Sequence, residues 1–310
     1  MRETLVVLGP TCSGKSAVAA RLAAQLGGEV VSFDSMQVYE KLPIGTAQPG
    51  PEELSLAPHH LVGFLPLQEA WNVNRFLPVV QETIRQIQGR GGVPVLAGGT
   101  GLYARALVYD FSLMPGDPAL ARRLREEATT EEKLEALRQE LRQAGDPPQD
   151  LLQNPRHLLR AVEVLRLTGK APWELKKHTQ NPREGFRQFT LLPDFTALKE
   201  RIRRRTALML RQGWIEECRE ALKAGLEETP TARQALGYRE IAAWLKGELP
   251  GTQEDLQTLL ANRTIQYARK QLTWFRHQHP GAIPLPFSQF TDETPAHLTR
   301  EILDTLSSCP

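Results

Sequence analysis

The octapeptide Gly9–Ser16, GPTCSGKS, constrains this chain more than any other segment. It fits G-x-x-x-x-G-K-[ST], follows the apolar run Leu5–Leu8 and precedes the helix-forming segment Ala17–Leu26. Its glycines let several backbone N–H groups point at one anion, to which the helix N-terminus adds positive charge. We expect a polyphosphate site, not necessarily for ATP, in which Lys15 reaches the terminal phosphate and Ser16 holds Mg²⁺. The residues expected at the phosphates are Gly9, Pro10, Thr11, Cys12, Ser13, Gly14, Lys15 and Ser16.

Two further strand-like runs, Val30–Phe33 and Val93–Leu96, are separated by a predicted helix over Ala70–Gln88. Strands that alternate with helices predict an α/β fold with a P-loop NTPase-like parallel sheet and flanking helices. Beyond residue 114 we expect helices alone until a strand at Phe189–Leu192, and helices again from Phe195 to about His277. The expected parts are a catalytic core over 1–114 and 186–280, a mostly helical insertion over 115–185, and a tail over 281–310 that is Pro-rich and then weakly helical.

Composition narrows the class of protein. Of the 310 residues, 41% are hydrophobic and 24% charged, which excludes disorder, collagen and coiled coil as descriptions of the whole chain. The net charge is only +2, so a nucleic-acid partner would require a local basic surface. Cys12, Cys218 and Cys309 fit neither a metal site nor a disulfide framework, which indicates the cytoplasm. We expect no membrane span and, with strand-like sequence from Thr4, no signal peptide.

Polar residues follow the second and third strands. Asp34 ends the strand Val30–Phe33, and Thr100 follows the strand Val93–Leu96. If these strands are neighbours, both residues face the bound phosphates, because ligands lie beyond the carboxyl ends of parallel strands. Asp34 is then a metal ligand, a general base or a solvated turn residue, while Thr100 alternatively caps a helix starting at Leu102. The third strand lacks the acid that holds Mg²⁺ in P-loop hydrolases, which favours a transferase.

Two arginines lie on or near an apolar helical stripe. Arg205 shares the stripe of Leu198, Ile202 and Met209, and Arg201 lies one turn before it. An arginine on a core-facing stripe is rarely unpaired. These arginines therefore either pair with a structural carboxylate or point into the phosphate site, where they would stabilise a leaving group.

The segment Asn262–His277 combines an apolar stripe with a basic and aromatic face. The stripe is Ile265, Ala268, Leu272 and Phe275, and the opposite side carries Arg263, Tyr267, Lys270, Trp274 and His277. Basic groups interleaved with aromatics suit phosphate contact and base stacking, and a solvated basic face is the alternative. Together with the pairs Arg156 and Arg160, and Arg122 and Arg123, this face indicates a nucleic-acid groove.

With these residues, the chain resembles the tRNA dimethylallyltransferase (tRNA isopentenyltransferase) family from its first strand to about His279. The blocks Asp34–Tyr39 and Gly98–Tyr103 are typical of that family, as are 58–61 (PHHL), 168–170 (TGK), 235–238 (ALGY) and 270–276 (KQLTWFR). The departures are Gln48 where the family usually has Lys, Gly63 and Phe64 where Asp is common nearby, and Cys12 in place of Ala.

The resemblance implies transfer of a dimethylallyl group from its diphosphate to the exocyclic amine of the adenosine 3′ of the anticodon in tRNA. Asp34 would be the general base, Thr100 would position amine and donor, and Arg201 or Arg205 would bind diphosphate with Lys15. The insertion would grip the anticodon stem-loop, and we expect a monomer. The implied tRNA-contacting residues are Asp34, Ser35, Met36, Gln37, Thr100, Arg122, Arg156, His157, Leu158, Leu159, Arg160, Arg233, Gln234, Ala235, Leu236, Gly237, Tyr238, Lys270, Gln271, Trp274 and Arg276.

Three other functions share some of these features. A small-molecule P-loop kinase would consume ATP without RNA, and an RNA-binding nucleotide switch would form no product. A transferase that prenylates free adenine nucleotides is nearest in chemistry. The Asp34 and Thr100 blocks disfavour the kinase, and the insertion with the basic helices favours a polymeric acceptor.

Overall fold

The computed structural model describes residues 3–109, 114–175 and 181–308. The chain forms two compact units, one of residues 1–109 and 180–310, the other of residues 110–179, where an insertion was expected over 115–185. Cys12 and Cys218 are free and buried, and Cys309 lies outside the described residues. No helix in the described ranges has the length and apolar character needed to cross a bilayer.

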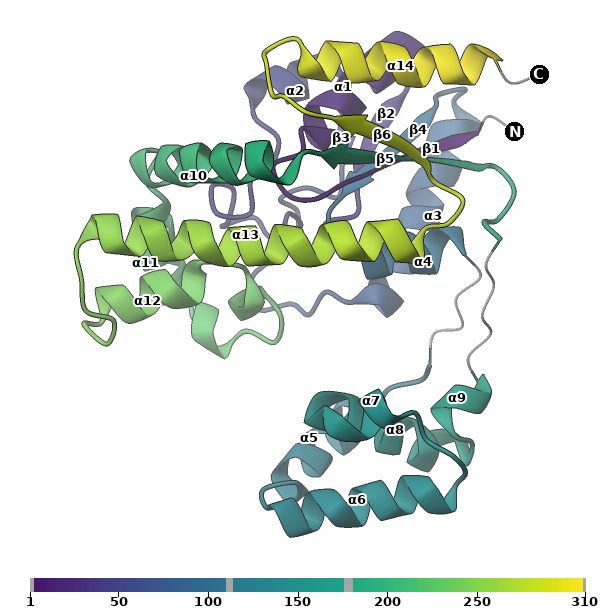
Figure 1. The fold of residues 1–310 in the computed structure, drawn as a ribbon, viewed down its shortest axis with the longest axis vertical. Helices are drawn as coiled ribbons and strands as arrows, with labels where there is room; N and C mark the ends of the chain where they lie inside the picture. Colours follow the sequence, from purple (N-terminus) through teal and green to yellow (C-terminus); the bar gives the residue numbers. More distant parts are fainter. Residues whose placement is uncertain (1–2, 110–113, 176–180, 309–310) are drawn as a thin grey trace. The chain divides into compact units, whose positions relative to one another are not determined.

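The first unit is built on one six-stranded parallel sheet with the order β3-β2-β4-β1-β5-β6 (Figure 1). Its strands are β1 Thr4–Leu8, β2 Glu29–Ser32, β3 His59–His60, β4 Pro94–Gly98, β5 Phe186–Pro193 and β6 Ile283–Phe287. Because β4 lies between β1 and β2, the three predicted strand ends meet at one edge of the sheet. The predicted α/β class and parallel sheet are therefore confirmed.

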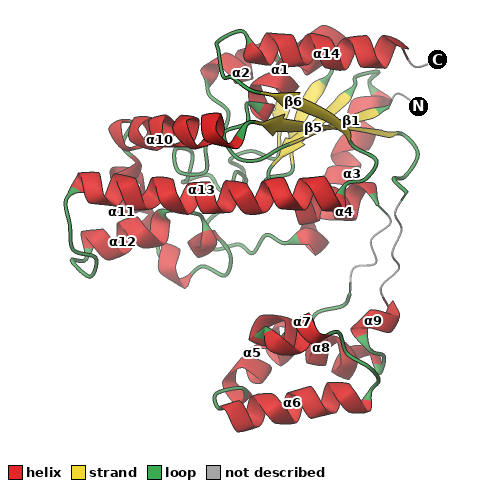
Figure 2. Ribbon diagram, viewed as in Figure 1, coloured by secondary structure: helices red, strands yellow, loops and turns green. Residues whose placement is uncertain are grey.

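Helices cover both faces of the sheet (Figure 2). The helices of this unit are α1 Lys15–Leu26, α2 Pro51–Leu56, α3 Val73–Gly89, α4 Gly101–Val108, α10 Phe195–Arg211, α11 Trp214–Lys223, α12 Tyr238–Leu245, α13 Gln253–Gln278 and α14 Thr294–Ser308, with short 3-10 turns η1 Leu226–Glu228 and η2 Ala232–Gln234. In β1, Leu5 and Val7 pack toward α1 and α14, while Val6 and Leu8 pack toward α3 and α4. Burial on both faces explains the unbroken apolar runs of these strands.

One predicted helix begins later than expected. The helix predicted from Ala70 starts at Val73, because the Asn72 side chain accepts hydrogen bonds from the N–H groups of Asn74 and Arg75 at 3.0 and 3.1 Å. Such a cap fixes the first turn of a helix.

The tail contains a strand that the sequence analysis did not predict. β6 pairs with β5 along its whole length. Pro284 and Pro286 made a strand unexpected here, because proline has no N–H to donate to a neighbouring strand. Proline is tolerated there because β6 is the edge strand, where an N–H that points outward has no partner to lose. The short strand β3 was also missed, and the weakly helical end of the tail is the fifteen-residue helix α14.

The second unit is helical throughout its described residues. It contains α5 Pro118–Glu127, α6 Glu131–Gln143, α7 Gln149–Gln153, α8 Pro155–Thr168 and α9 Pro172–Leu175. Leucines from α5, α6, α7 and α8, such as Leu124, Leu141 and Leu158, form its core. The unit therefore has its own apolar centre, as a domain requires.

Candidate active site

The loop between β1 and α1 has the backbone geometry of an anion cradle. Gly14 precedes α1 with φ of 89°, a left-handed conformation that favours glycine, and Cys12 also has a positive φ, of 63°. The Ser13 N–H and the Lys15 Nζ both donate to the Pro10 carbonyl, each at 3.2 Å. The loop thus curls over the start of α1, where free N–H groups and the helix dipole favour an anion.

The Lys15 side chain is partly buried beside this loop. Burial lowers its pKa from 10.5 to about 8, Arg205 lowers it further, and the Asp34 carboxylate acts in the opposite direction. A phosphate at the loop would stabilise the protonated amine, because an opposite charge nearby favours the charged form.

The end of β2 is fastened to the end of β4. Thr100 Oγ1 accepts a hydrogen bond from the Ser35 N–H at 3.0 Å and donates one to Ser35 Oγ at 3.2 Å. Thr100 is also the N-cap residue of α4, which begins at Gly101, but its side chain bonds none of the N–H groups of that helix. Among the described residues Ser35 lines the cavity beside the loop and Thr100 does not, so Thr100 supports Ser35 from behind.

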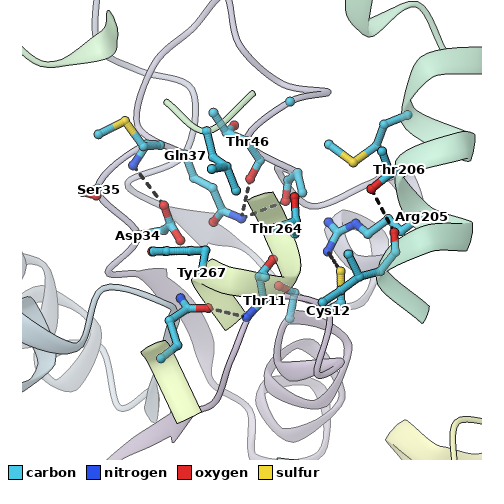
Figure 3. A pocket seen from close by; sticks show the side chains of 18 of the residues that line it. Thr11, Cys12, Asp34, Ser35, Gln37, Thr46, Arg205, Thr206, Thr264 and Tyr267 are labelled. Atoms are coloured by element: carbon cyan, nitrogen blue, oxygen red, sulfur yellow. Dashed lines mark hydrogen bonds between the residues drawn. The ribbon is translucent and has the colours of Figure 1, made fainter. Parts of the chain in front are cut away.

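Asp34 lines the same cavity. Its Oδ1 accepts the Met36 N–H at 2.9 Å, which is the local turn contact that the sequence allowed. In the described part of the chain Oδ2 accepts no hydrogen bond, and the side chain faces the space in front of Thr11 (Figure 3). One carboxylate oxygen therefore fixes the side chain and the other remains available to a ligand.

Gln271 of α13 joins two loops of the site. Its Oε1 accepts the Thr11 N–H at 2.8 Å, and its Nε2 donates to the Gly99 carbonyl at 2.8 Å. The side chain is buried, so Gln271 acts inside the protein as a link between the phosphate loop and the turn after β4. Its contact with tRNA stays a prediction.

Both arginines of α10 lie against the phosphate loop. Arg205 Nη1 donates to Cys12 Sγ at 3.4 Å, and the Arg201 guanidinium stacks on the Phe290 ring, 4.5 Å from its centroid. In the described residues neither arginine has a carboxylate within 4.0 Å, so the alternative of a structural ion pair is wrong. Burial, together with Arg205 and Arg204, lowers the pKa of Arg201.

Two cavities meet at the phosphate loop. The first, of about 330 Å³, contains Asp34, which Figure 3 labels, and an apolar wall formed by Ile202, Met209 and Trp214. The second, of about 690 Å³, is lined by two carboxylates, Glu53 and Asp292, and by five cationic side chains: Lys15, Arg201, Arg204, Arg205 and Arg211. Cys12, Lys15, Ser16, Ala47 and Arg205 line both cavities. An apolar, acid-containing space is thus adjacent to a strongly cationic one.

Residues 45–47 form a wall of the first cavity, and their segment is held by Glu217, which no motif indicated, and by Gln37 of the Asp34–Tyr39 block. Glu217 of α11 accepts the N–H groups of Ile44 and Gly45 at 2.7 and 2.8 Å and also the Tyr238 hydroxyl. Gln37 Nε2 donates to the Ala47 carbonyl at 2.7 Å. The ALGY block contains Tyr238, but Glu217 lies outside every block, so only the fold reveals this anchor.

The departure at Gln48 has a structural explanation. Its Nε2 donates to the carbonyls of Gln37 and Tyr39 at 2.9 and 2.8 Å. The amide therefore fastens the same wall from the inside. Gly63, the second departure, has φ of 55° and donates its N–H to Gln37 at 2.8 Å.

Helix α13 has the two faces that its sequence predicted. Ala268, Leu272 and Phe275 are buried, whereas Tyr267 and Trp274 are 39% and 37% exposed. Tyr267 lines the first cavity beside Asp34, and burial raises its pKa. Trp274 lies so close to Gly101 that an added Cβ would be 2.2 Å from the indole. Arg263 is instead paired with Glu240 at 3.4 Å.

Two family models match the chain: IPP transferase over residues 37–278 and isopentenyl transferase over residues 2–59. The chain belongs to the IPP transferase family. A tRNA dimethylallyltransferase of Thermus thermophilus is 41% identical over 291 residues, covering 92% of this chain and 93% of the relative. Another, of Allorhizobium ampelinum, is 37% identical over 283 residues, covering 89% of this chain and 92% of the relative. The resemblance drawn from the sequence blocks is therefore confirmed.

Solved structures agree with this assignment. A tRNA isopentenylpyrophosphate transferase of Bacillus halodurans superposes with a TM-score of 0.70 at 29% identity, over 99% of this chain and 97% of that one. A eukaryotic dimethylallyltransferase acting on tRNA gives a TM-score of 0.80 at 25% identity, over 100% of this chain and 81% of that one. Family membership makes the chain a prenyltransferase, which excludes the kinase and the nucleotide switch.

Within this IPP transferase, the expected tRNA-contacting residues divide into exposed, partly buried and buried groups. The exposed ones are Arg122, Arg156, His157, Arg233, Gln234, Lys270, Trp274 and Arg276, and the partly buried ones are Asp34, Ser35, Met36, Gln37, Thr100, Leu159, Arg160 and Leu236. Leu158, Ala235, Gly237 and Tyr238 are buried. For Leu158 and Tyr238 the expectation of a side-chain contact with RNA is corrected, because both pack inside hydrophobic cores.

The donor set at the loop suits Mg²⁺. Ser16 lines both cavities and offers a hydroxyl, and the described residues contain no cluster of three His, Cys, Asp or Glu that could hold a metal by itself. Mg²⁺ commonly takes one or two protein oxygens and fills its remaining positions with phosphate oxygens and water. The residues of this IPP transferase therefore fit a Mg²⁺ ion bound together with a diphosphate.

Proposed function

We propose that this chain transfers the dimethylallyl group of dimethylallyl diphosphate to the exocyclic amine of the adenosine 3′ of the anticodon in tRNA, releasing diphosphate. The observation that carries the proposal is the junction of the two cavities: one holds Asp34 and an apolar wall, and the other holds five cations. The bond to be broken joins a hydrocarbon to a diphosphate, which matches that junction.

The cationic cavity supports the donor end of the reaction. Negative charge grows on the bridging oxygen as the carbon–oxygen bond breaks. Lys15, Arg201 and Arg205, with the N–H groups of the loop, surround the place where that charge would develop. Preorganised donors of this kind stabilise a leaving group strongly. Mg²⁺ held at Ser16 would supply further positive charge to the diphosphate.

The first cavity supports the acceptor end. An exocyclic amine is a weak nucleophile, because its lone pair is delocalised into the purine ring, so it must lose a proton as the carbon–nitrogen bond forms. The Oδ2 of Asp34 is oriented by the Met36 contact and faces the cavity. A general base in this position contributes roughly 10²–10⁴ to the rate. Tyr267 offers a ring on which the base could stack.

Exposed residues support a polymeric acceptor over a free nucleotide. Trp274 lies on the exposed face of α13 with Lys270 and Arg276, and none of the three lines the first cavity, so their use calls for an acceptor that extends beyond it. Phosphate contacts and stacking there would offset the few kcal/mol needed to extrude the adenine. We also propose a cytoplasmic monomer, because one chain supplies the loop, the acid and the arginines, and the acceptor is a cytoplasmic RNA.

The test is mass spectrometry of tRNA nucleosides after incubation with protein, Mg²⁺ and dimethylallyl diphosphate. The expected result is one adenosine per tRNA that carries a dimethylallyl group next to the anticodon, with diphosphate released in equal amount. Modification of free AMP in preference to tRNA would contradict the proposed acceptor, and unmodified tRNA would contradict the proposal as a whole.

A further inference from the structure

Arg201 has an unusual environment for a half-buried arginine. Its guanidinium lies near the cations Arg204 and Arg205, and none of the described carboxylates is within 4.0 Å. Burial is the largest cause of its lowered pKa, and the two like charges lower it further, whereas Cys12 and the Asp292 carboxylate, which is not in ion-pair contact, act in the opposite direction. Something other than an ion pair must therefore hold this side chain in place.

That contact comes from the tail. The Phe290 ring faces the Arg201 guanidinium at 4.5 Å, within the range of a cation–π interaction. Phe290 lies outside the residues matched by the two family models, which end at residue 278. The contact is thus made by a segment that was expected to be only a Pro-rich tail.

The ring is itself held firmly. It meets the Phe287 ring edge to face, with centroids 5.1 Å apart, and it packs against the cluster of Cys12 and Ile202. The preceding strand β6 is paired with β5, and the Asp194 N–H donates to the Phe287 carbonyl at 2.8 Å. After the ring, Thr294 Oγ1 accepts the Thr291 N–H at 2.8 Å and closes the turn that leads into α14.

We propose that Phe290 is a positioning residue, which holds the Arg201 guanidinium at the phosphate loop with its N–H groups free for the donor diphosphate. An aromatic face stabilises the guanidinium from above and leaves the N–H donors in its plane unoccupied. A carboxylate in the same place would take those donors and compete with the diphosphate. This inference rests on the proposed function, because it assigns the ligand of Arg201.

The test compares three single variants of the full-length chain. Phe290→Leu keeps an apolar side chain but removes the π face, and Phe290→Tyr restores it. Phe64→Leu is the control, because it removes an exposed ring that packs on Trp71 and lines neither cavity. Binding of inorganic diphosphate with Mg²⁺ is measured by isothermal titration calorimetry, and the KM values for donor and for tRNA are measured separately. Thermal unfolding checks that each variant is folded.

We expect Phe290→Leu to weaken diphosphate binding and to raise the donor KM about fivefold, which corresponds to about 1 kcal/mol. The tRNA KM should stay unchanged, and Phe290→Tyr and the control Phe64→Leu should remain within about twofold of the wild type. In an Arg201→Ala background the Phe290→Leu effect should vanish, because the two residues act as one unit.

The outcomes separate the two levels of the argument. If the wild type binds diphosphate and Phe290→Leu binds it equally well, the positioning role alone is overturned. An equal effect of Phe290→Leu with and without Arg201 overturns it as well. A wild-type protein that neither binds diphosphate nor modifies tRNA overturns the proposed function and this inference with it.

Discussion

Gln271 accepts a hydrogen bond from the backbone N–H of Thr11 at 2.8 Å, although 260 positions separate the two residues in the chain. The same side chain also reaches the Gly99 carbonyl. Helix α13 therefore fixes both the phosphate loop and the turn after β4, and its inner face holds the site in shape while its outer face carries the exposed aromatics.

The first prediction concerns this link. Gln271→Leu leaves the Thr11 N–H and the Gly99 carbonyl without their partner, so it should lower the free energy of unfolding by about 2 kcal/mol. Urea unfolding measures the loss. Gln266→Leu is the matched control, since Gln266 is exposed on the same helix and should change stability by less than about 0.5 kcal/mol. Equal effects of the two substitutions would show that the link is unimportant.

The second prediction concerns the acid. Asp34→Asn keeps the shape of the side chain and an oxygen for the Met36 N–H, but it cannot accept a proton. Single-turnover prenyl transfer should fall by about 10²–10⁴, while tRNA binding persists, and Asp34→Ala should lose transfer in the same way. Turnover near that of the wild type would refute Asp34 as the general base.

The third prediction concerns the exposed face of α13. Trp274→Ala should weaken tRNA binding by about 1–3 kcal/mol and leave diphosphate binding nearly intact, because the indole is far along the helix from the cationic cavity. Filter binding of tRNA and calorimetry of diphosphate supply the two affinities. Arg263→Ala is the control, since Arg263 is already paired with Glu240. A similar loss of both ligands would argue against a nucleic-acid surface.

The fourth prediction concerns pH. Because the pKa of Lys15 is lowered to about 8, its ammonium loses its proton near pH 8 in the free protein, well below the usual value of 10.5. The charged form is the one that binds an anion, so diphosphate affinity should decline as the pH rises through about 8. Lys15→Arg keeps its charge and should show a flatter profile over the same range. Identical profiles for the two proteins would contradict the assignment.

The core of the fold could be predicted from short stretches of sequence. The phosphate loop lies between a strand and a helix, and Asp34 and Thr100 follow strands, so each signal spans fewer than ten residues. Since β4 lies between β1 and β2, these signals meet at one edge without further information. Local patterns suffice where backbone conformation and burial on both faces dictate the residue types.

The contacts that shape the site could not be predicted in this way. Glu217 meets Ile44 across 173 positions, and Phe290 meets Arg201 from the segment that follows β6, a strand that its prolines made hard to predict. Neither contact leaves a periodic pattern, because each depends on one side chain reaching a distant element. Thr100 shows the same effect. Its place before a helix predicts a side-chain cap, but its hydroxyl oxygen accepts the N–H of Ser35, 65 positions away, instead of a helix N–H.

The two prolines of β6 also determine what happens at the outer margin of the sheet. Since β6 pairs with β5 on its inner side, Pro284 and Pro286 leave the outward side without N–H groups at two alternate positions. A neighbouring molecule in a concentrated solution would find too few donors there to add a strand of its own. The same two prolines that made β6 hard to predict from the sequence therefore protect this edge of the sheet from edge-to-edge aggregation.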